Sequence, residues 1–388
     1  MNIVFCRYRN VCESDHIEAF KALGINVVEV YINELGTDTI EDKAAAIASI
    51  VRQNTPMFVF SINYFPYLSI VCQGLGIKYV SVSVTCPMME IYSTTIRNSC
   101  NRVFLFDYEQ YLSIHDENPE GIFYLPLGAG TSRIDNLLKG ESGYLYDVSF
   151  VGSLYNEKDP FSALKISDSS RNRYESLMRQ QIKSCSYNQD LLENSISDED
   201  VKEIKNAATD FYPSELSVRD MSRFVAINNY LSPHMTYLER VDILNSLAEG
   251  LPSNKVHLFT KSDTSKLNSV VIHGGVATLT EMPIVFKKSR INLNLTTRSI
   301  KTGLPQRIWE ILASEGFLLT NYQDEIPEYF EIGKHLVAYE NDDELLELVR
   351  YYLEHEDQRK EIAQNGYEAS RAIGSTLGRV VDIIKAIA

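Results

Sequence analysis

The chain has 388 residues, of which 44% are hydrophobic and 23% are charged. At about 150 residues per domain this length predicts two to three domains, and the composition excludes disordered, collagen-like and coiled-coil proteins. The net charge of −15 argues against a surface built mainly to neutralise nucleic-acid phosphates.

The chain shows no targeting or membrane signal. The first residues lack the apolar core of a signal peptide, and no stretch has the roughly 18 consecutive apolar residues of a membrane helix. We therefore expect a cytoplasmic protein with no integral membrane segment. Its cysteines are scattered without a Cys-x-x-Cys pair, so we interpret them as reduced thiols: Cys6, Cys12, Cys72, Cys86, Cys100 and Cys185.

Short β-branched runs alternate with helical stretches in the N-terminal third, which predicts a parallel sheet covered by helices. Asp15 and Glu18 have the spacing of a capping box and predict the start of a helix that Gly24 ends. A second helix is predicted at residues 40–53. The predicted strands are residues 3–7, 26–32, 57–63, 78–84, 101–107 and 122–127.

The alternation breaks at residues 128–146, where we place a domain linker. A strand and a Gly152-Ser153 turn follow, and residues from about 156 to 250 are predicted as a helical insertion. Further strands are predicted at residues 255–260, 270–273, 290–295, 317–321 and 335–339, with helices at 305–315, 343–365 and 376–388. The predicted domains are residues 1–140 and 146–372, followed by a terminal helix in 373–388.

The most informative stretch is residues 282–309, which contains cations and no acidic residue in an otherwise acidic chain. The cations are Lys287, Lys288, Arg290, Arg298, Lys301 and Arg307. Pro305 suits the first turn of the helix that follows the strand at residues 290–295. Unpaired N–H groups at a helix start, a nearby glycine and cations together predict a diphosphate site at residues 302–307.

Arg307 and Glu310 are three positions apart and therefore share one face of this helix. A carboxylate there can accept both hydroxyls of a ribose, so the pair is consistent with a nucleotide site. The alternative interpretation is an ordinary helix–sheet unit with an exposed ion pair, and the pattern alone leaves both open.

At this point the sequence resembles a known family. Residues 290–295, 302–313 and 316–323 are similar to the CgeB-like, spore-maturation type of glycosyltransferase. The similarity continues at residues 337–340 and 351–356, and includes the turn at 147–155, His273-Gly274 and residues 104–107 and 125–127.

The resemblance implies a GT-B fold, an α/β architecture of two Rossmann-like domains facing a central cleft. The C-terminal domain would bind a nucleotide-sugar and the N-terminal domain the acceptor, with no essential metal and no cofactor besides the donor. The final helix would pack back on the N-terminal domain.

The resemblance also implies roles for individual residues. Glu310 would hold the ribose, while Arg307 and Lys301 would face the diphosphate. Gly152 and Ser153 would let the first turn approach the diphosphate, and His273 would lie near the base or the sugar. Asn294, Thr302, Gly303 and Leu304 would complete the donor site.

Two positions depart from the patterns of related enzymes. Many retaining GT-B enzymes have a glutamate eight positions before the ribose-binding one, where this chain has Thr302. CgeB-like proteins tend to carry an acidic residue before the proline after the fourth strand, where this chain has Thr85. Thr85 is therefore the residue at the position where an acid or base would be expected.

Other motifs have simpler explanations. Asp198-Glu199-Asp200 has the Asp-x-Asp form of metal-dependent transferases, but Ser197 and Asp200 are better explained as a helix cap. The histidines lack the spacing of a zinc site. Arg7 and Arg9 are either phosphate contacts or a surface pair. Four aromatic residues either stack on an acceptor sugar or fill the core: Tyr64, Phe65, Tyr67 and Tyr92.

The predicted function is transfer of a sugar from a nucleotide-diphosphate sugar to a glycan, a protein or another acceptor. We expect a UDP-sugar because uridine is the commonest base in such enzymes. Three alternatives remain: a nucleotide-sugar-binding protein without transferase activity, a nucleotide-sugar epimerase, and a DNA-modifying glycosyltransferase. The negative net charge disfavours the last of these.

Overall fold

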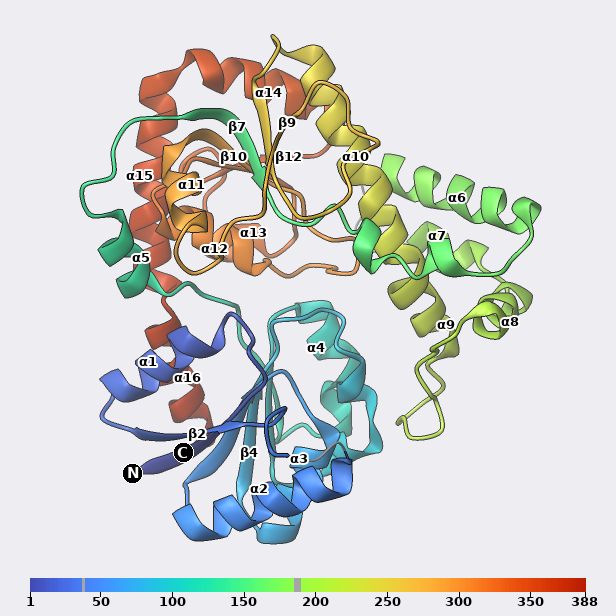
Figure 1. The fold of residues 1–388 in the computed structure, drawn as a ribbon, viewed down its shortest axis with the longest axis vertical. Helices are drawn as coiled ribbons and strands as arrows, with labels where there is room; N and C mark the ends of the chain where they lie inside the picture. Colours follow the sequence, from blue (N-terminus) through green and yellow to red (C-terminus); the bar gives the residue numbers. More distant parts are fainter. Residues whose placement is uncertain (37–38, 185–189) are drawn as a thin grey trace. The chain divides into compact units, whose positions relative to one another are not determined.

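A computed structural model describes residues 1–36, 39–184 and 190–388, which form two compact units (Figure 1). The first unit consists of Met1–Gly130, Glu215–Arg219 and Gly374–Ala388. The second consists of Thr131–Ser214 and Asp220–Ile373. Each unit contains a six-stranded parallel sheet with helices, so the prediction of two Rossmann-like domains is confirmed.

The sheet of the first unit has the order β2-β1-β3-β4-β5-β6. Its strands are β1 (Asn2–Arg7), β2 (Asn26–Tyr31), β3 (Phe58–Ile62), β4 (Lys78–Val82), β5 (Asn101–Leu105) and β6 (Ile122–Tyr124). Its helices are α1 (Glu13–Ala22), α2 (Ile40–Asn54), α3 (Pro66–Leu75), α4 (Tyr108–Ile114) and α16 (Thr376–Ile387). All five residues of the central strand β3 are buried, as expected for a parallel strand covered on both faces.

The C-terminal helix α16 packs beside α1 in this first unit (Figure 1). Val380 and Ile383 of α16 belong to the same apolar core as Ile17 and Phe20 of α1. The Arg379 Nε also donates a hydrogen bond of 3.0 Å to the Leu127 carbonyl. The apolar stripe of the last helix is therefore part of the N-terminal core.

The start of α1 differs from the predicted capping box at Asp15 and Glu18. The helix begins at Glu13, and its N-cap Cys12 makes no side-chain capping bond. Glu13 is fully buried, and its carboxylate accepts hydrogen bonds from the Arg7 Nε and the Tyr8 backbone N–H. These tertiary contacts, rather than a local cap, define the first turn.

The sheet of the second unit has the order β12-β11-β10-β7-β8-β9. Its strands are β7 (Tyr146–Val151), β8 (Val256–Phe259), β9 (Val271–His273), β10 (Ser289–Asn294), β11 (Leu318–Asn321) and β12 (Val337–Tyr339). The helices that accompany it are α5 (Thr131–Leu138), α11 (Met282–Lys288), α12 (Gln306–Ala313), α13 (Ile326–Tyr329), α14 (Asp342–Glu354) and α15 (Glu356–Ile373).

A helical insertion separates β7 from β8 in the second unit (Figure 1). It contains α6 (Asp168–Lys183), α7 (Asp190–Ser195), α8 (Asp198–Ala207), α9 (Ser222–Val225) and α10 (Ser232–Gly250). Ser197 and Asp200 form the predicted capping box at α8, which confirms the capping interpretation of this acidic motif. Residues 215–219 leave the insertion and pair with the first unit, where Ser217 bridges Ser93.

Two boundaries differ from those expected. The first unit ends at Gly130 rather than at residue 140, because α5 packs against α11 and α12 of the second unit. The single helix predicted at residues 343–365 is divided into α14 and α15, since His355 has ψ of 70° and leaves the helical conformation.

The described cysteines are not joined in disulfides: Cys6, Cys12, Cys72, Cys86 and Cys100. Cys185 lies outside the described residues. Within residues 1–36, 39–184 and 190–388, none of the helices is both long and apolar enough to cross a bilayer.

Candidate functional site

The candidate site lies at the carboxyl ends of the strands in the second unit, where open α/β sheets bind ligands. The turn after β7 carries Gly152 and Ser153, the loop after β10 carries Thr302, Gly303 and Leu304, and α12 carries Arg307 and Glu310. β7 and β10 are neighbours in the sheet, so their loops leave adjacent positions on one edge.

Arg307 and Glu310 form an ion pair on α12, with 3.2 Å between the Arg307 Nη1 and a Glu310 carboxylate oxygen. The predicted shared face is confirmed, but the pair is not an exposed one because Glu310 is only 7% exposed. Arg307 also contacts Met282 and lies 5.4 Å above the Phe286 ring. Burial lowers the pKa of Arg307, and the Glu310 charge opposes this shift. The ribose and diphosphate roles stay predictions.

The positive charge of residues 282–309 is compensated in the folded chain. Each of its six cations forms an ion pair with a carboxylate outside the segment: Lys287–Glu315, Lys288–Glu141, Arg290–Asp147, Arg298–Glu239, Lys301–Glu193 and Arg307–Glu310. The positive charge expected from the sequence is therefore neutralised in the fold. Carboxylates from remote parts of the chain reach four of the cations, and Glu310 and Glu315, which follow the segment, reach the other two. Lys301, predicted to face diphosphate, lies 3.3 Å from Glu193 of α7.

The Arg298–Glu239 pair anchors the loop after β10 to α10. Arg298 is 2% exposed and Glu239 is 7% exposed, and the Arg298 Nε lies 2.8 Å from a Glu239 carboxylate oxygen. The Arg298 backbone N–H also donates to the Thr236 hydroxyl at 2.9 Å. Both contacts fix the first part of the loop against the insertion.

Thr302 is joined to a carboxylate that the sequence analysis did not identify. Its hydroxyl donates a 2.7 Å hydrogen bond to Glu325 Oε1, and the Glu325 backbone N–H donates to the Thr302 carbonyl at 3.3 Å. Thr302 and Glu325 are 7% and 6% exposed. No motif indicated this pair, because its members are far apart in the chain and lie on different loops. Leu304 is buried, which makes it a packing residue of the loop.

Asn294, predicted at the donor site, joins the ends of two strands. Its amide nitrogen donates to the Thr296 hydroxyl at 3.0 Å and to the Thr320 hydroxyl at 2.9 Å. The Thr296 backbone N–H donates to Asn321 Oδ1 at 2.9 Å. These bonds hold β10 and β11 in register where the donor loop begins.

The turn after β7 is joined to the loop after β8 through Glu157. Its carboxylate accepts hydrogen bonds from Ser153 Oγ at 2.5 Å and from Ser262 Oγ at 2.8 Å. Burial would raise the pKa of Glu157, but these hydrogen bonds hold it below its ordinary value. A carboxylate at this place fixes both turns at neutral pH.

Arg240 of α10 is a positioning residue that sequence reasoning missed. It is 7% exposed, its Nη1 donates to the Ser153 carbonyl at 2.6 Å, and its Nη2 donates to the Leu295 carbonyl. It thus connects the loops after β7 and β10. The insertion gave no pattern that could have identified it.

Lys261, directly after β8, is a second residue that the sequence analysis missed. It is exposed, and it forms no ion pair with another residue in the described part of the chain. A side chain at Gly275 would come within 2.5 Å of Lys261 Cγ, so the glycine lets the lysine stem cross the loop after β9. Lys261 neighbours Ser262 and therefore belongs to the same edge as Ser153.

His273 ends β9 with its ring packed on the sheet. Its Nε2 lies 3.1 Å from the His257 Nδ1, and the ring stacks on Phe259 with centroids 4.3 Å apart. Burial lowers the pKa of His273, which favours the neutral imidazole at pH 7. A Cβ added at Gly274 would meet no other atom within 4 Å. The role of His273 near the base or the sugar stays a prediction.

Thr85 lies at the carboxyl end of β4 in the first unit and is exposed. Its hydroxyl accepts a 3.1 Å hydrogen bond from Asn63 Nδ2, which also donates to the Tyr8 hydroxyl at 3.0 Å. Burial raises the pKa of Tyr8 to about 12. A hydroxyl held by an amide supplies no acid or base at neutral pH.

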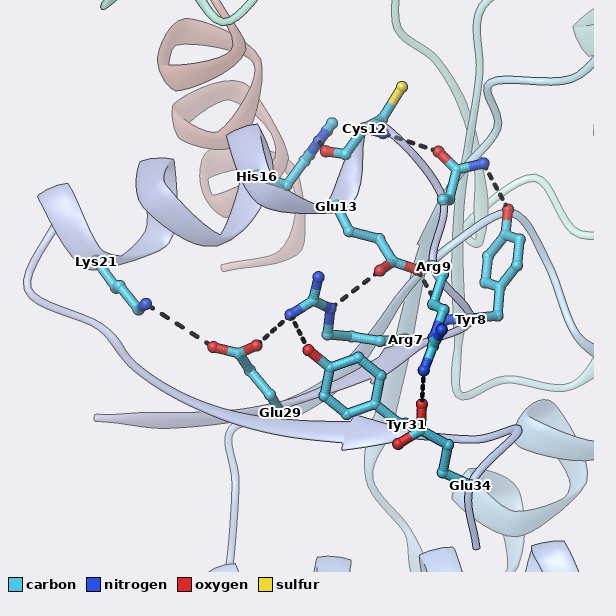
Figure 2. Close-up of polar contacts among 11 residues, drawn as sticks. Arg7, Tyr8, Arg9, Cys12, Glu13, His16, Lys21, Glu29, Tyr31 and Glu34 are labelled. Carbon is cyan, nitrogen blue, oxygen red and sulfur yellow. Dashed lines mark hydrogen bonds and ion pairs between the residues drawn. The ribbon is translucent and has the colours of Figure 1, made fainter. Parts of the chain in front are cut away.

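Arg7 and Arg9 are engaged by carboxylates, as Figure 2 shows. The Arg7 Nε lies 3.0 Å from Glu13, and its Nη1 contacts Glu29. Arg9 lies 2.5 Å from Glu34 at the surface. The surface-pair interpretation therefore describes Arg9, while Arg7 forms a half-buried network.

Of the four aromatic residues considered for acceptor stacking, Tyr64 and Tyr92 are 1% exposed and belong to the core. Phe65 and Tyr67 are partly exposed. Among the residues that the structure describes, no cluster of three His, Cys, Asp or Glu side chains could hold a metal ion.

Comparison with known proteins identifies residues 240–383 as similar to the glycosyl transferase-like family. This stretch begins at Arg240 and includes the loops after β8 to β12 and the whole of α12. None of the curated proteins compared with the chain matches it.

Solved structures resemble the chain over nearly its full length. A glycosyltransferase from Rickettsia africae is 14% identical, with a TM-score of 0.53 over 99% of this chain and 97% of that one. HepE from Anabaena, solved with UDP and glucose, is 12% identical, with a TM-score of 0.53 over 100% and 99% of the chains. Sucrose-phosphate synthase from Thermosynechococcus elongatus is 8% identical, with a TM-score of 0.58 over 100% and 98%. The protein therefore has the GT-B glycosyltransferase fold that the sequence predicted.

Proposed function

We propose that this protein is a glycosyltransferase of the CgeB-like type that uses a nucleotide-sugar, with UDP as the expected nucleotide. The observation that carries the proposal is the glycosyl transferase-like match at residues 240–383, since it includes α12 with its buried Glu310. The complex of HepE with UDP and glucose supports the choice of UDP.

Within this proposal the donor binds across the loops after β7, β8 and β10. Glu310 accepts the ribose hydroxyls, and the Gly152-Ser153 turn lies against the diphosphate. Lys261 is the cation best suited to the diphosphate, because it is exposed and forms no described ion pair. Arg307 acts on the diphosphate if its guanidinium leaves the Met282 side chain when the donor binds. If the guanidinium stays, Arg307 positions the Glu310 carboxylate.

The catalytic effect expected of this site is electrostatic. Transfer of the sugar leaves growing negative charge on the departing diphosphate, and fixed donors or cations stabilise that charge. No metal is needed in this mechanism, and none of the residue roles depends on one. The acceptor, a glycan or a protein, would bind to the first unit, where Thr85 lies at the carboxyl edge.

The test is isothermal titration of UDP with four proteins. Glu310→Ala should weaken UDP binding because the ribose loses its acceptor. Lys261→Met should weaken binding by about tenfold through loss of one charge-assisted bond, whereas Lys266→Met, an exposed lysine of the same loop, should not. Wild-type protein that binds no nucleotide, or a Glu310→Ala variant with unchanged affinity, would contradict the proposal.

A transfer assay then separates an enzyme from a binding protein. Wild-type protein should release UDP from a UDP-sugar when a suitable acceptor is present, and Arg307→Ala should reduce kcat by about 10²–10³. An unchanged kcat would show that Arg307 does not act on the diphosphate.

A further inference from the structure

Two histidines join the outer strands of the second sheet. His257 of β8 and His273 of β9 are far apart in the chain, but the distance between the His257 Nδ1 and the His273 Nε2 is 3.1 Å. Such a contact is a hydrogen bond only while one of the two facing nitrogens lacks a proton. When both rings are protonated, two N–H groups and two positive charges face each other, so the contact becomes repulsive.

Aromatic rings surround part of this contact. The Phe259 ring stacks on His273 with 4.3 Å between centroids, and the Tyr146 ring of β7 lies 5.3 Å from His257 and 5.5 Å from His273. Burial lowers the pKa of both imidazoles. Because each pKa is lower in the fold than in the unfolded chain, the unfolded chain binds more protons below about pH 6.5. Acid therefore removes stability from this part of the sheet.

The charges near the pair do not favour a second proton. Burial is the main cause of the lowered pKa of His257, His273 and Lys255 add to this shift, and Asp147 opposes it. The Asp147 carboxylate lies 2.8 Å from the Lys255 Nζ and 3.5 Å from the Arg290 Nε. These two cations already neutralise the one carboxylate that acts on His257, so two protonated rings would lack compensation.

The strand β9 is weakly held by its backbone. It is the outermost strand of the sheet, has three residues and pairs with β8 alone among the described strands. The Thr260 backbone N–H donates to the His273 carbonyl at 3.4 Å, longer than the usual ~2.9–3.0 Å. Ile272 is 45% exposed and contributes little burial. The contact between the two histidines is therefore a substantial part of what keeps β9 paired with β8.

The loop after β9 connects this contact to the candidate donor site. Gly274 and Gly275 follow His273 directly. A Cβ at Gly275 would lie 2.5 Å from Lys261 Cγ and 2.8 Å from Lys261 Cε, so the loop passes close against the lysine stem. A displacement of β9 would therefore change the position of Lys261, the cation assigned above to the diphosphate.

We propose that the His257–His273 contact is a pH-sensitive switch in the second unit. Binding of a second proton breaks the hydrogen bond, loosens β9 from β8 and displaces Lys261, so that the nucleotide binds less tightly in acid. The last step rests on the proposed function, because it assigns Lys261 to the diphosphate. The loosening of β9 does not depend on that assignment.

Hydrogen–deuterium exchange of the ligand-free protein tests the first step. Rates measured at pH 7.5 and 5.5 are divided by the intrinsic chemical rates, and the resulting protection factors are compared for each peptide. Protection of residues 270–276 should fall by at least about threefold in acid, while that of residues 317–322, which contain β11, should stay within about twofold.

His257→Asn is the diagnostic variant. An amide can donate to a neutral His273 and accept from a protonated one, so the contact survives at both pH values. The protection of residues 270–276 should then change by less than about twofold between the two pH values. His273→Gln should behave in the same way and serves if His257→Asn does not fold. His355→Gln, which removes a partly exposed histidine stacked on Tyr351, is the control and should retain the wild-type response.

Isothermal titration of UDP at the two pH values tests the link to Lys261. UDP gains a proton itself near pH 6, so the proteins are compared by the ratio of their dissociation constants at pH 5.5 and 7.5. The wild-type ratio should exceed that of His257→Asn by at least about threefold. Lys261→Met should give the same ratio as His257→Asn, because it lacks the cation that is displaced.

The outcomes separate failure of the switch from failure of the function. Protection of residues 270–276 that does not change with pH in wild type, or that falls equally in His257→Asn, refutes the switch and leaves the donor site standing. Loosening of β9 with equal UDP ratios in wild type and His257→Asn refutes the link to Lys261. If wild type binds no UDP at either pH, the proposed function fails, and the exchange data still decide whether the two histidines hold β9.

Discussion

Replacing Arg298 by methionine should destabilise the second unit strongly, because it leaves the Glu239 carboxylate buried without its cation. The side chains of Arg298 and Glu239 are 2% and 9% exposed and share two hydrogen bonds, one of them 2.8 Å long. Removing one partner of such a buried pair typically costs about 3–5 kcal/mol. By contrast, Lys334→Met should lower the free energy of unfolding by no more than about 1 kcal/mol, since the side chains of Lys334 and Glu331 are 55% and 65% exposed.

The double variant Arg298→Met with Glu239→Leu should recover most of the loss, because two apolar side chains replace two charges of similar volume. We expect a coupling free energy of at least about 2 kcal/mol from the four-protein cycle. Urea unfolding can be followed by the fluorescence of Trp309, which is the only tryptophan in the sequence and is buried in α12 of the same unit. The structural role of the pair would be refuted if each single variant lost less than about 1 kcal/mol of unfolding free energy and the two losses were additive.

Two further predictions concern the insertion. In the Arg240→Lys variant the lysine retains the charge but cannot reach both the Ser153 and Leu295 carbonyls. The free energy of unfolding should therefore fall by about 1–3 kcal/mol, and UDP binding should weaken. Unchanged UDP titration and urea unfolding curves would contradict this prediction. Burial would raise the pKa of Asp200, but Arg173 and Ser197 hold it at about 2. A lowered carboxylate pKa stabilises the fold above the ordinary value of about 4 and loses this contribution as the pH falls toward 2. Asp200→Asn should therefore lower the free energy of unfolding at pH 7 by about 1–2 kcal/mol. Between about pH 4 and 2 the urea midpoint of the variant should fall less steeply with decreasing pH than that of wild type. An equally steep fall would contradict the role given to the Asp200 carboxylate.

Local patterns in the sequence were sufficient to predict the elements of both sheets. Parallel strands buried on both faces are runs of β-branched and aromatic residues, which is why β3 and β10 were visible without a structure. Capping is also local, and the Ser197 cap of α8 was predicted for that reason. The start of α1 could not be predicted in this way, because the Glu13 contacts that fix it come from Arg7 and Tyr8.

The same distinction between local patterns and tertiary contacts applies to the candidate site. The Arg307–Glu310 pair was predictable, since a helix brings residues three apart together whatever surrounds it. The neutralisation of Lys301 and Arg298 was not predictable from the sequence. The carboxylates of Glu193 and Glu239 reach these two cations only because the insertion packs against them. Local spacing along the chain indicated the elements of the site and the Arg307–Glu310 pair. The contacts of Arg240, Lys301 and Thr302 depend on the fold, since hydrogen bonds and ion pairs require closeness in space and not along the chain.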